Sequence, residues 1–169
     1  AGACAVVLRL NRGPGLGKCN RDGAAKHMSG HTMPLTLVGL MLFGVGFFCF
    51  LMACVIVPGE SWSWFADQPA TIYGTPITLS ALSFNILMGI AGGIIGTWIF
   101  TKDPFWMMSG ALAGIISTAS GLDIYFPGMT FIIAFGAGAI LAPCANWLQN
   151  RGIDDAVGAV TVHGTIGLY

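Results

Sequence analysis

The sequence has 169 residues, of which 55% are hydrophobic and only 8% are charged, with a mean hydropathy of +0.78. Soluble domains carry about 25% charged residues, so this chain has too few charges to cover a water-facing surface. Seven basic and seven acidic residues cancel to a formal net charge of zero, so no overall field attracts polyanions. The composition excludes a disordered chain, a nucleic-acid binder and an ordinary soluble enzyme. It predicts an integral membrane protein built from helices.

The first segment, 1–10, is apolar but too short to cross a bilayer, and no basic region precedes it. We therefore expect it to be the tail of a truncated helix rather than a signal peptide. Residues 11–33 are rich in glycine and basic residues, which predicts a loop. The N-terminal part of the chain thus leads into the membrane domain without forming a domain of its own.

The remaining residues, 34–169, are expected to form a membrane domain of about five helices. A bilayer core of about 30 Å requires about 20 apolar helical residues. The expected helices are 34–57, 77–100, 105–121, 126–148 and 155–169. The third is short, Pro143 is expected to interrupt the fourth, and the fifth covers only about four turns. With the first segment, these stretches give four spans and two partial ones.

The basic residues fall in alternate loops. Five lie between Arg9 and Lys26, Lys102 follows the second predicted span, and Arg151 follows the fourth, whereas the loop at 58–76 has none. Basic loops stay in the cytoplasm, so this alternation predicts both the span count and the orientation. The segments expected in the cytoplasm are 11–33, 101–104 and 149–154.

Small residues recur at helical spacing inside the predicted spans. Gly89 and Gly93 lie four residues apart in one helix, and Gly110 and Gly114 lie four apart in the next. Such spacing lets helix backbones approach closely in lipid. We therefore predict that these four glycines pack helix against helix.

Reactive residues form no recognisable catalytic or metal-binding pattern. The five cysteines contain no CxxC pair, and the sequence has no nucleophile elbow, HExxH motif or phosphate-binding loop. We expect no enzyme activity, no metal and no cofactor. The complete spans also lack charged residues, which argues against an ion-coupled pump and favours a pore for a neutral species or a purely structural bundle.

Three segments carry a family resemblance. Residues 31–35 read HTMPL, residues 109–114 read SGALAG, and residues 154–167 read DDAVGAVTVHGTIG. In this order they resemble the sixth, eighth and tenth helices of the ammonium transporter (Amt/Mep/Rh) family. Full members have eleven spans, arranged in two inverted repeats, and assemble as homotrimers. The resemblance therefore implies the end of the fifth helix and the whole second repeat, which is half of the family's fold.

The resemblance implies pore-lining roles for three residues. His163 matches a histidine that lines the narrow pore opposite a second histidine, whose place would precede Ala1. Phe50 matches an aromatic gate at the outer mouth, and Cys54 stands where the family often has a recruiting serine. Each of the first two also has a purely structural alternative. His163 could be a buried histidine that donates to a backbone carbonyl, and Phe50 could be a core or lipid-facing phenylalanine.

The acidic pair before the last predicted helix has a structural explanation. Asp154 and Asp155 are expected to cap that helix, because carboxylates accept from free N–H groups at a helix N-terminus and oppose its dipole. The family's third acidic residue in this motif is replaced by Gly158. Asn85, inside a span, is expected to join helices by hydrogen bonds.

Two functions remain open. The chain is either the second-repeat portion of an ammonium/ammonia channel, working with the missing transporter half, or a non-transporting structural subunit of a larger membrane assembly. Its expected partners are the lipid bilayer and other membrane subunits, with a homotrimer implied only for a full transporter. His163, Phe50 and the motif order favour the channel, whereas Cys54, Gly158 and the missing half of the pore wall favour the structural subunit.

Overall fold

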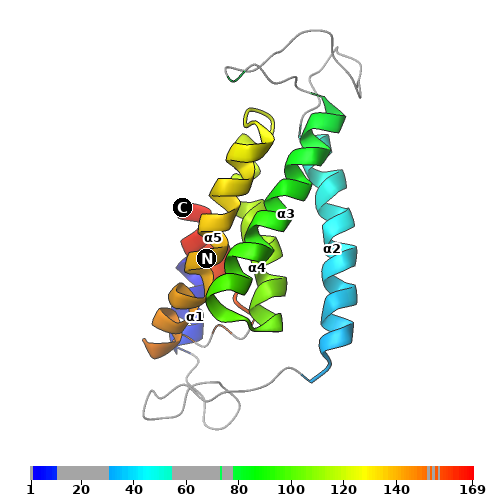
Figure 1. Ribbon diagram of the computed structural model, residues 1–169. Coiled ribbons are helices and arrows are strands. Elements are labelled where there is room, and N and C mark those ends of the chain that lie inside the picture. The colour runs from blue at the N-terminus through cyan, green and yellow to red at the C-terminus, as the bar shows by residue number, and fades with distance from the viewer. Residues whose placement is uncertain are drawn as a thin grey trace.

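The structure is a computed structural model that describes residues 2–10, 31–54, 73, 78–151, 153, 155 and 157–169. The helices are α1 (Gly2–Leu10), α2 (Met33–Ala53), α3 (Leu79–Thr101), α4 (Pro104–Thr118), the 3₁₀ turn η1 (Ala119–Gly121), α5 (Pro127–Asn150), the π-helical turn η2 (Thr161–Thr165) and α6 (Ile166–Leu168). These ranges contain no strand, and the all-α fold class is confirmed (Figure 1).

Three of the described helices, α2, α3 and α5, are long and apolar enough to cross a membrane. The predicted span at 105–121 is instead the 15-residue α4 followed by η1. The predicted interruption at Pro143 is wrong, because α5 runs through this residue to Asn150. Proline removes one helical hydrogen bond, but the residues on either side of it stay helical because α5 packs along α3 and α4.

The last predicted helix starts later than residue 155. Gly158 has a φ of +74°, a left-handed conformation that glycine adopts without a Cβ clash. Helical residues begin at Ala159 and continue through η2 into α6. The glycine therefore ends the connection after α5 and sets where the final helix starts.

The centre of the bundle is formed by α3, α4 and α5, which pack against one another more extensively than any other elements. All four predicted packing glycines are buried between α3 and α4. A Cβ on Gly93 would lie 2.9 Å from the Cα of Gly114 and would also collide with the carbonyl oxygen of Gly110. These backbones are in direct contact, which larger residues would prevent.

A buried threonine adds a polar link to this centre. The Thr97 hydroxyl lies 2.8 Å from the carbonyl oxygen of Gly93 in its own helix and 3.1 Å from that of Gly138 in α5. Its side chain is fully buried. Because the alternative in lipid is an unsatisfied hydroxyl, this bond helps to fix α5 against α3.

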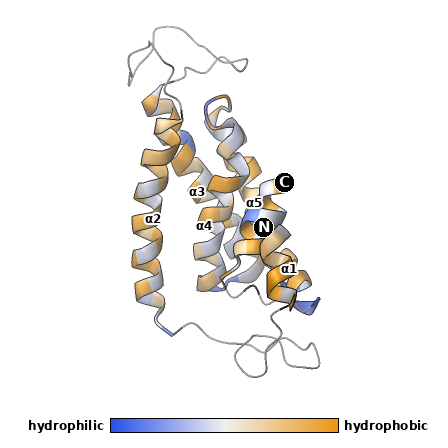
Figure 2. Ribbon diagram, turned by 180° about the vertical axis from the view of Figure 1, so that it is seen from behind, coloured by the Kyte–Doolittle hydropathy of each residue, from blue (hydrophilic) through white to orange (hydrophobic). Residues whose placement is uncertain are grey.

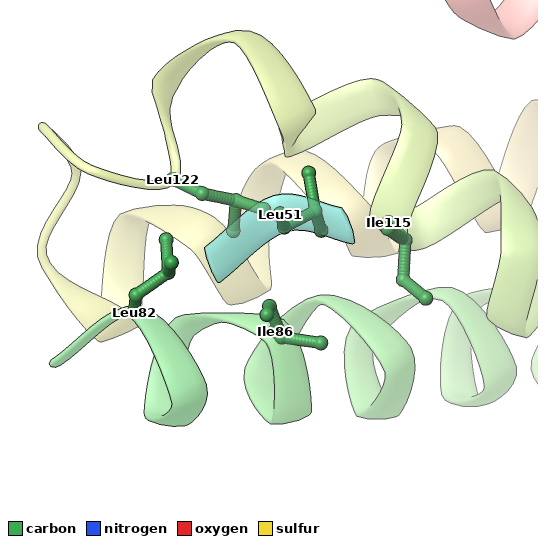
Figure 3. Packing of buried hydrophobic residues seen from close by; sticks show 5 residues of the cluster. All are labelled: Leu51, Leu82, Ile86, Ile115 and Leu122. Carbon is green, nitrogen blue, oxygen red and sulfur yellow. The ribbon is translucent and has the colours of Figure 1, made fainter. Parts of the chain in front are cut away.

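The α2 helix lies on the outside of the bundle (Figure 1). Its buried residue is Leu51, which joins a cluster with Leu82, Ile86, Ile115 and Leu122 near the end of the helix (Figure 3). Figure 2 shows hydrophobic residues on α2 along its whole length. A helix that is apolar on all sides suits a lipid environment.

One end of the bundle carries two basic helix caps. Lys102 is the C-cap of α3 and Arg151 is the C-cap of α5, and both helices finish at the end where α2 begins (Figure 1). The Arg151 guanidinium lies 4.2 Å from the ring centroid of Trp147, a cation–π distance. We call this end of the bundle the basic end.

Candidate functional site

His163 lies in the middle of the π-helical turn η2. In this turn the N–H of Ile166 donates to the carbonyl oxygen of Thr161, five residues earlier. Such turns insert an extra residue into a helix and occur frequently at functional sites. The turn therefore determines the direction in which the imidazole leaves the helix.

Asp155 holds the start of this turn. Its Oδ2 accepts from the backbone N–H of Thr161 at 2.9 Å and from the Thr161 hydroxyl at 3.0 Å. The Asp155 side chain is only 3% exposed, and Thr161 is fully buried. The carboxylate thus satisfies a free N–H in the first turn of the helix, although it lies outside the helix itself. Asp154 is outside the described residues.

His163 borders a shallow, largely open cavity of about 720 Å³ between η2, α6, α1 and α5. Gly2 and Ala5 contribute the α1 side of this cavity, and Ile140 contributes the α5 side. The lining is largely apolar, with the imidazole as its nitrogen-bearing side chain. We call this space the His163 cavity.

The imidazole is exposed to this cavity and has no hydrogen bond to any described residue. The alternative of a buried histidine donating to a backbone carbonyl is therefore wrong for the described part of the chain. A neutral imidazole has one N–H donor and one nitrogen acceptor. Both groups remain available to a small polar molecule in the cavity.

The structure separates the other two predicted pore residues from His163. Phe50 is 62% exposed on α2 and Cys54 is the exposed C-cap of the same helix. α2 lies on the far side of the bundle from α6 in both views (Figures 1 and 2), and neither residue lines the His163 cavity. The described chain therefore does not gather the three residues into one site.

Several residues of the site were not predicted from the sequence. Thr161 anchors the π turn, and Thr165 and Tyr169 line the His163 cavity. A threonine six residues after a carboxylate is a weak signal, because the backbone path between them decides whether they meet. The described residues contain no group of three side chains that could hold a metal ion.

Asn85 joins α3 to the connection between α4 and α5. Its Nδ2 donates to the carbonyl oxygens of Leu122 and Tyr125, each at 2.7 Å, and the side chain is 3% exposed. The residue was predicted to bond from helix to helix; it instead links α3 to the connection that follows α4. It lies outside the His163 cavity and is structural.

The described chain is thus a polytopic helical membrane protein with an imidazole at the edge of an apolar cavity. The sequence model of the Ammonium Transporter Family matches residues 1–169. The chain belongs to this family.

Individual relatives agree with this assignment. The chain is 28% identical to ammonium transporter Amt2 of Archaeoglobus fulgidus, with 99% of this chain and 33% of the relative covered. It is 28% identical to Amt1 of Haloferax mediterranei (98% and 33% covered) and 29% identical to the ammonium transporter of Bacillus subtilis (100% and 38% covered). The chain therefore spans about a third of the length of these relatives. No solved structure matches it.

Proposed function

We propose that this chain forms part of the pore wall of an ammonium/ammonia channel and corresponds to the second repeat of the family's fold. The observation that carries the proposal is the position of His163, exposed at the edge of a largely apolar cavity beside α1. By the resemblance, α1 is the end of the fifth helix, and the pore runs next to it. The other wall would come from the first repeat of the fold.

The chemistry of the cavity suits a small neutral molecule. A hydrated cation entering an apolar space loses water contacts that the walls do not replace. Ammonia loses far less, and an imidazole can donate one hydrogen bond to it or accept one from it. The α1 wall of the cavity consists of the small residues Gly2 and Ala5, which leave room for this contact. His163 would thus orient ammonia while the apolar lining excludes ions.

Replacing His163 with alanine is expected to change methylammonium uptake. The measurement is uptake of labelled methylammonium into vesicles made from membranes that contain the protein with its natural partners. His31→Ala is the matched control, because His31 is exposed at the start of α2 and lies outside the cavity. We expect the control to take up methylammonium like the unaltered protein.

Background uptake by both the unaltered protein and His163→Ala would contradict the channel. That result would support the structural subunit, whose role is to hold other membrane subunits. Equal, substantial uptake by both proteins would place the pore elsewhere and remove His163 from it.

We also propose that the basic end faces the cytoplasm, because all seven basic residues fall in, or at the ends of helices that border, alternate connections along the chain. In a background with the native cysteines replaced by serine, Trp64→Cys should react with an impermeant maleimide added outside intact cells. Lys18→Cys should react only after the cells are opened. The opposite pattern would reverse the orientation.

A further inference from the structure

The buried amide of Asn85 has one polar atom that accepts no hydrogen bond from any described residue. This atom is Oδ1, and the side chain is only 3% exposed. The other end of the amide lies 2.7 Å from two backbone carbonyl oxygens, those of Leu122 and Tyr125. Because carbonyl oxygens only accept, the end that faces them must be the NH2 group. Turning the amide over would place an oxygen against two oxygens, so the unpaired atom is the amide oxygen.

Hydroxyl groups in the adjoining helical turns do not supply a donor. A hydroxyl has a single proton to donate. The hydroxyls of Ser83, Thr118 and Thr130 each donate to the backbone carbonyl oxygen four residues earlier in the chain. A buried amide oxygen without any donor is rare in folded proteins, and it is costly inside a membrane-spanning helix. Oδ1 therefore requires a donor other than these side chains.

The surroundings of the amide restrict the kind of donor. Leu82 and Ile86 precede and follow Asn85 on α3, and Leu122 provides one of its carbonyl partners. All three belong to the apolar cluster in Figure 3 and are 4%, 0% and 2% exposed, respectively. A cation here would lose hydration that these side chains do not replace, and the N–H groups of the same amide would repel it. The chemistry favours a small, neutral donor.

Water meets these requirements. A water molecule has two O–H groups, and each of the two carbonyl oxygens beside Nδ2 has a second lone pair. One water can thus donate to Oδ1 and to the carbonyl oxygen of Leu122 or Tyr125, which provides the two polar partners that a buried water needs at minimum. We propose that Asn85 Oδ1 binds a single buried water molecule and, through it, ties α3 to the connection between α4 and α5.

Hydroxyl-radical labelling with X-rays tests this proposal on the unaltered protein, purified with its natural partners in mild detergent. X-rays convert a bound water into a radical that oxidises the side chains next to it, whereas radicals formed in bulk water do not reach buried side chains. We expect oxidation of Leu82, Ile86 or Leu122 several-fold above that of Leu141. Leu141 is the matched control, because it is 0% exposed and lies in a different cluster. Oxidation of all three residues no greater than that of Leu141 would overturn the proposal.

Two variants connect the label to the amide. Asn85→Leu removes Oδ1 and should lower the oxidation of Ile86 to the level of Leu141. Thr97→Val is the control for a general loss of stability, because it removes a buried hydroxyl that lies near the carbonyl of Gly138, three turns further along α3. It should leave the oxidation of Ile86 unchanged. Equal oxidation of Ile86 in the unaltered protein and in Asn85→Leu would show that the amide does not hold the water.

A second measurement needs no substitution and decides the question even if Asn85→Leu fails to fold. A density map of the protein at a resolution that shows ordered water should contain a peak about 2.8 Å from Oδ1, the usual O–H···O distance. A second contact to the carbonyl oxygen of Leu122 or Tyr125 is expected. A backbone N–H or a side chain in that place would overturn the proposal. Both measurements are independent of methylammonium uptake, so they test this site even if the proposed channel function fails.

Discussion

Replacing Gly93 with leucine should prevent the helices from packing. The backbone of α4 occupies the space that a side chain at this position requires, since a Cβ would lie 2.9 Å from the Gly114 Cα. Extra atoms in a packed core typically cost about 1–3 kcal/mol. Here the obstacle is backbone rather than a flexible side chain, so we expect at least the upper end of this range. Thermal unfolding in detergent, followed by circular dichroism, measures the loss.

Two milder variants make this test quantitative. At Gly89 a Cβ would meet the Thr118 Oγ1 at 3.2 Å, so Gly89→Ala should cost less than Gly93→Ala. At Gly44 a Cβ would meet no described atom within 4 Å, so Gly44→Ala should leave the unfolding temperature nearly unchanged. Equal unfolding temperatures for all three alanine variants would show that the α3–α4 contact does not stabilise the protein.

Hydropathy and small-residue spacing predict much of this fold. Long uncharged stretches mark α2, α3 and α5 because a bilayer sets their length. Glycines four residues apart mark the α3–α4 contact because only small residues permit it. Both signals are local in the sequence, and both reflect a constraint that the membrane imposes on every helix.

Features that depend on tertiary contacts were not predictable in the same way. The sequence suggested an interruption at Pro143, but contacts with α3 and α4 keep α5 helical there. Asn85 could be expected to bond across helices, yet its partners are the backbone carbonyls of Leu122 and Tyr125. Any residue type supplies a carbonyl, so no pattern of side chains identifies such partners.

The candidate site also combines features that the sequence predicts with features that depend on tertiary packing. His163 stands out in the sequence as an imidazole in an apolar helix, but the π turn that directs it depends on the path between Asp155 and Thr161. The family resemblance groups Phe50 and Cys54 with His163, whereas α2 lies across the bundle from η2 (Figure 1). A motif gives the order of residues along the chain, and the packing of helices decides which of them meet.

The contact between Asp155 and Thr161 leads to the second large expected effect. One carboxylate oxygen accepts both the N–H and the hydroxyl of Thr161 in a buried setting. Hydrogen bonds to a charged group contribute about 1.5–3 kcal/mol each. Asp155→Ala would remove both bonds and leave two buried donors without a partner, so we expect a loss of several kcal/mol and a displaced π turn. Asp155→Asn keeps an acceptor oxygen and should lose less.

The displacement of the turn can be separated from a general loss of stability. With the native cysteines replaced by serine and His163 replaced by cysteine, the rate of reaction with a small maleimide reports access to position 163. Asp155→Ala should change this rate at temperatures where the bundle remains folded. Ser117→Ala is the control, because Ser117 donates to the Gly114 carbonyl oxygen within α4, away from the turn. An unchanged rate in Asp155→Ala would mean that the turn holds His163 in place without the carboxylate.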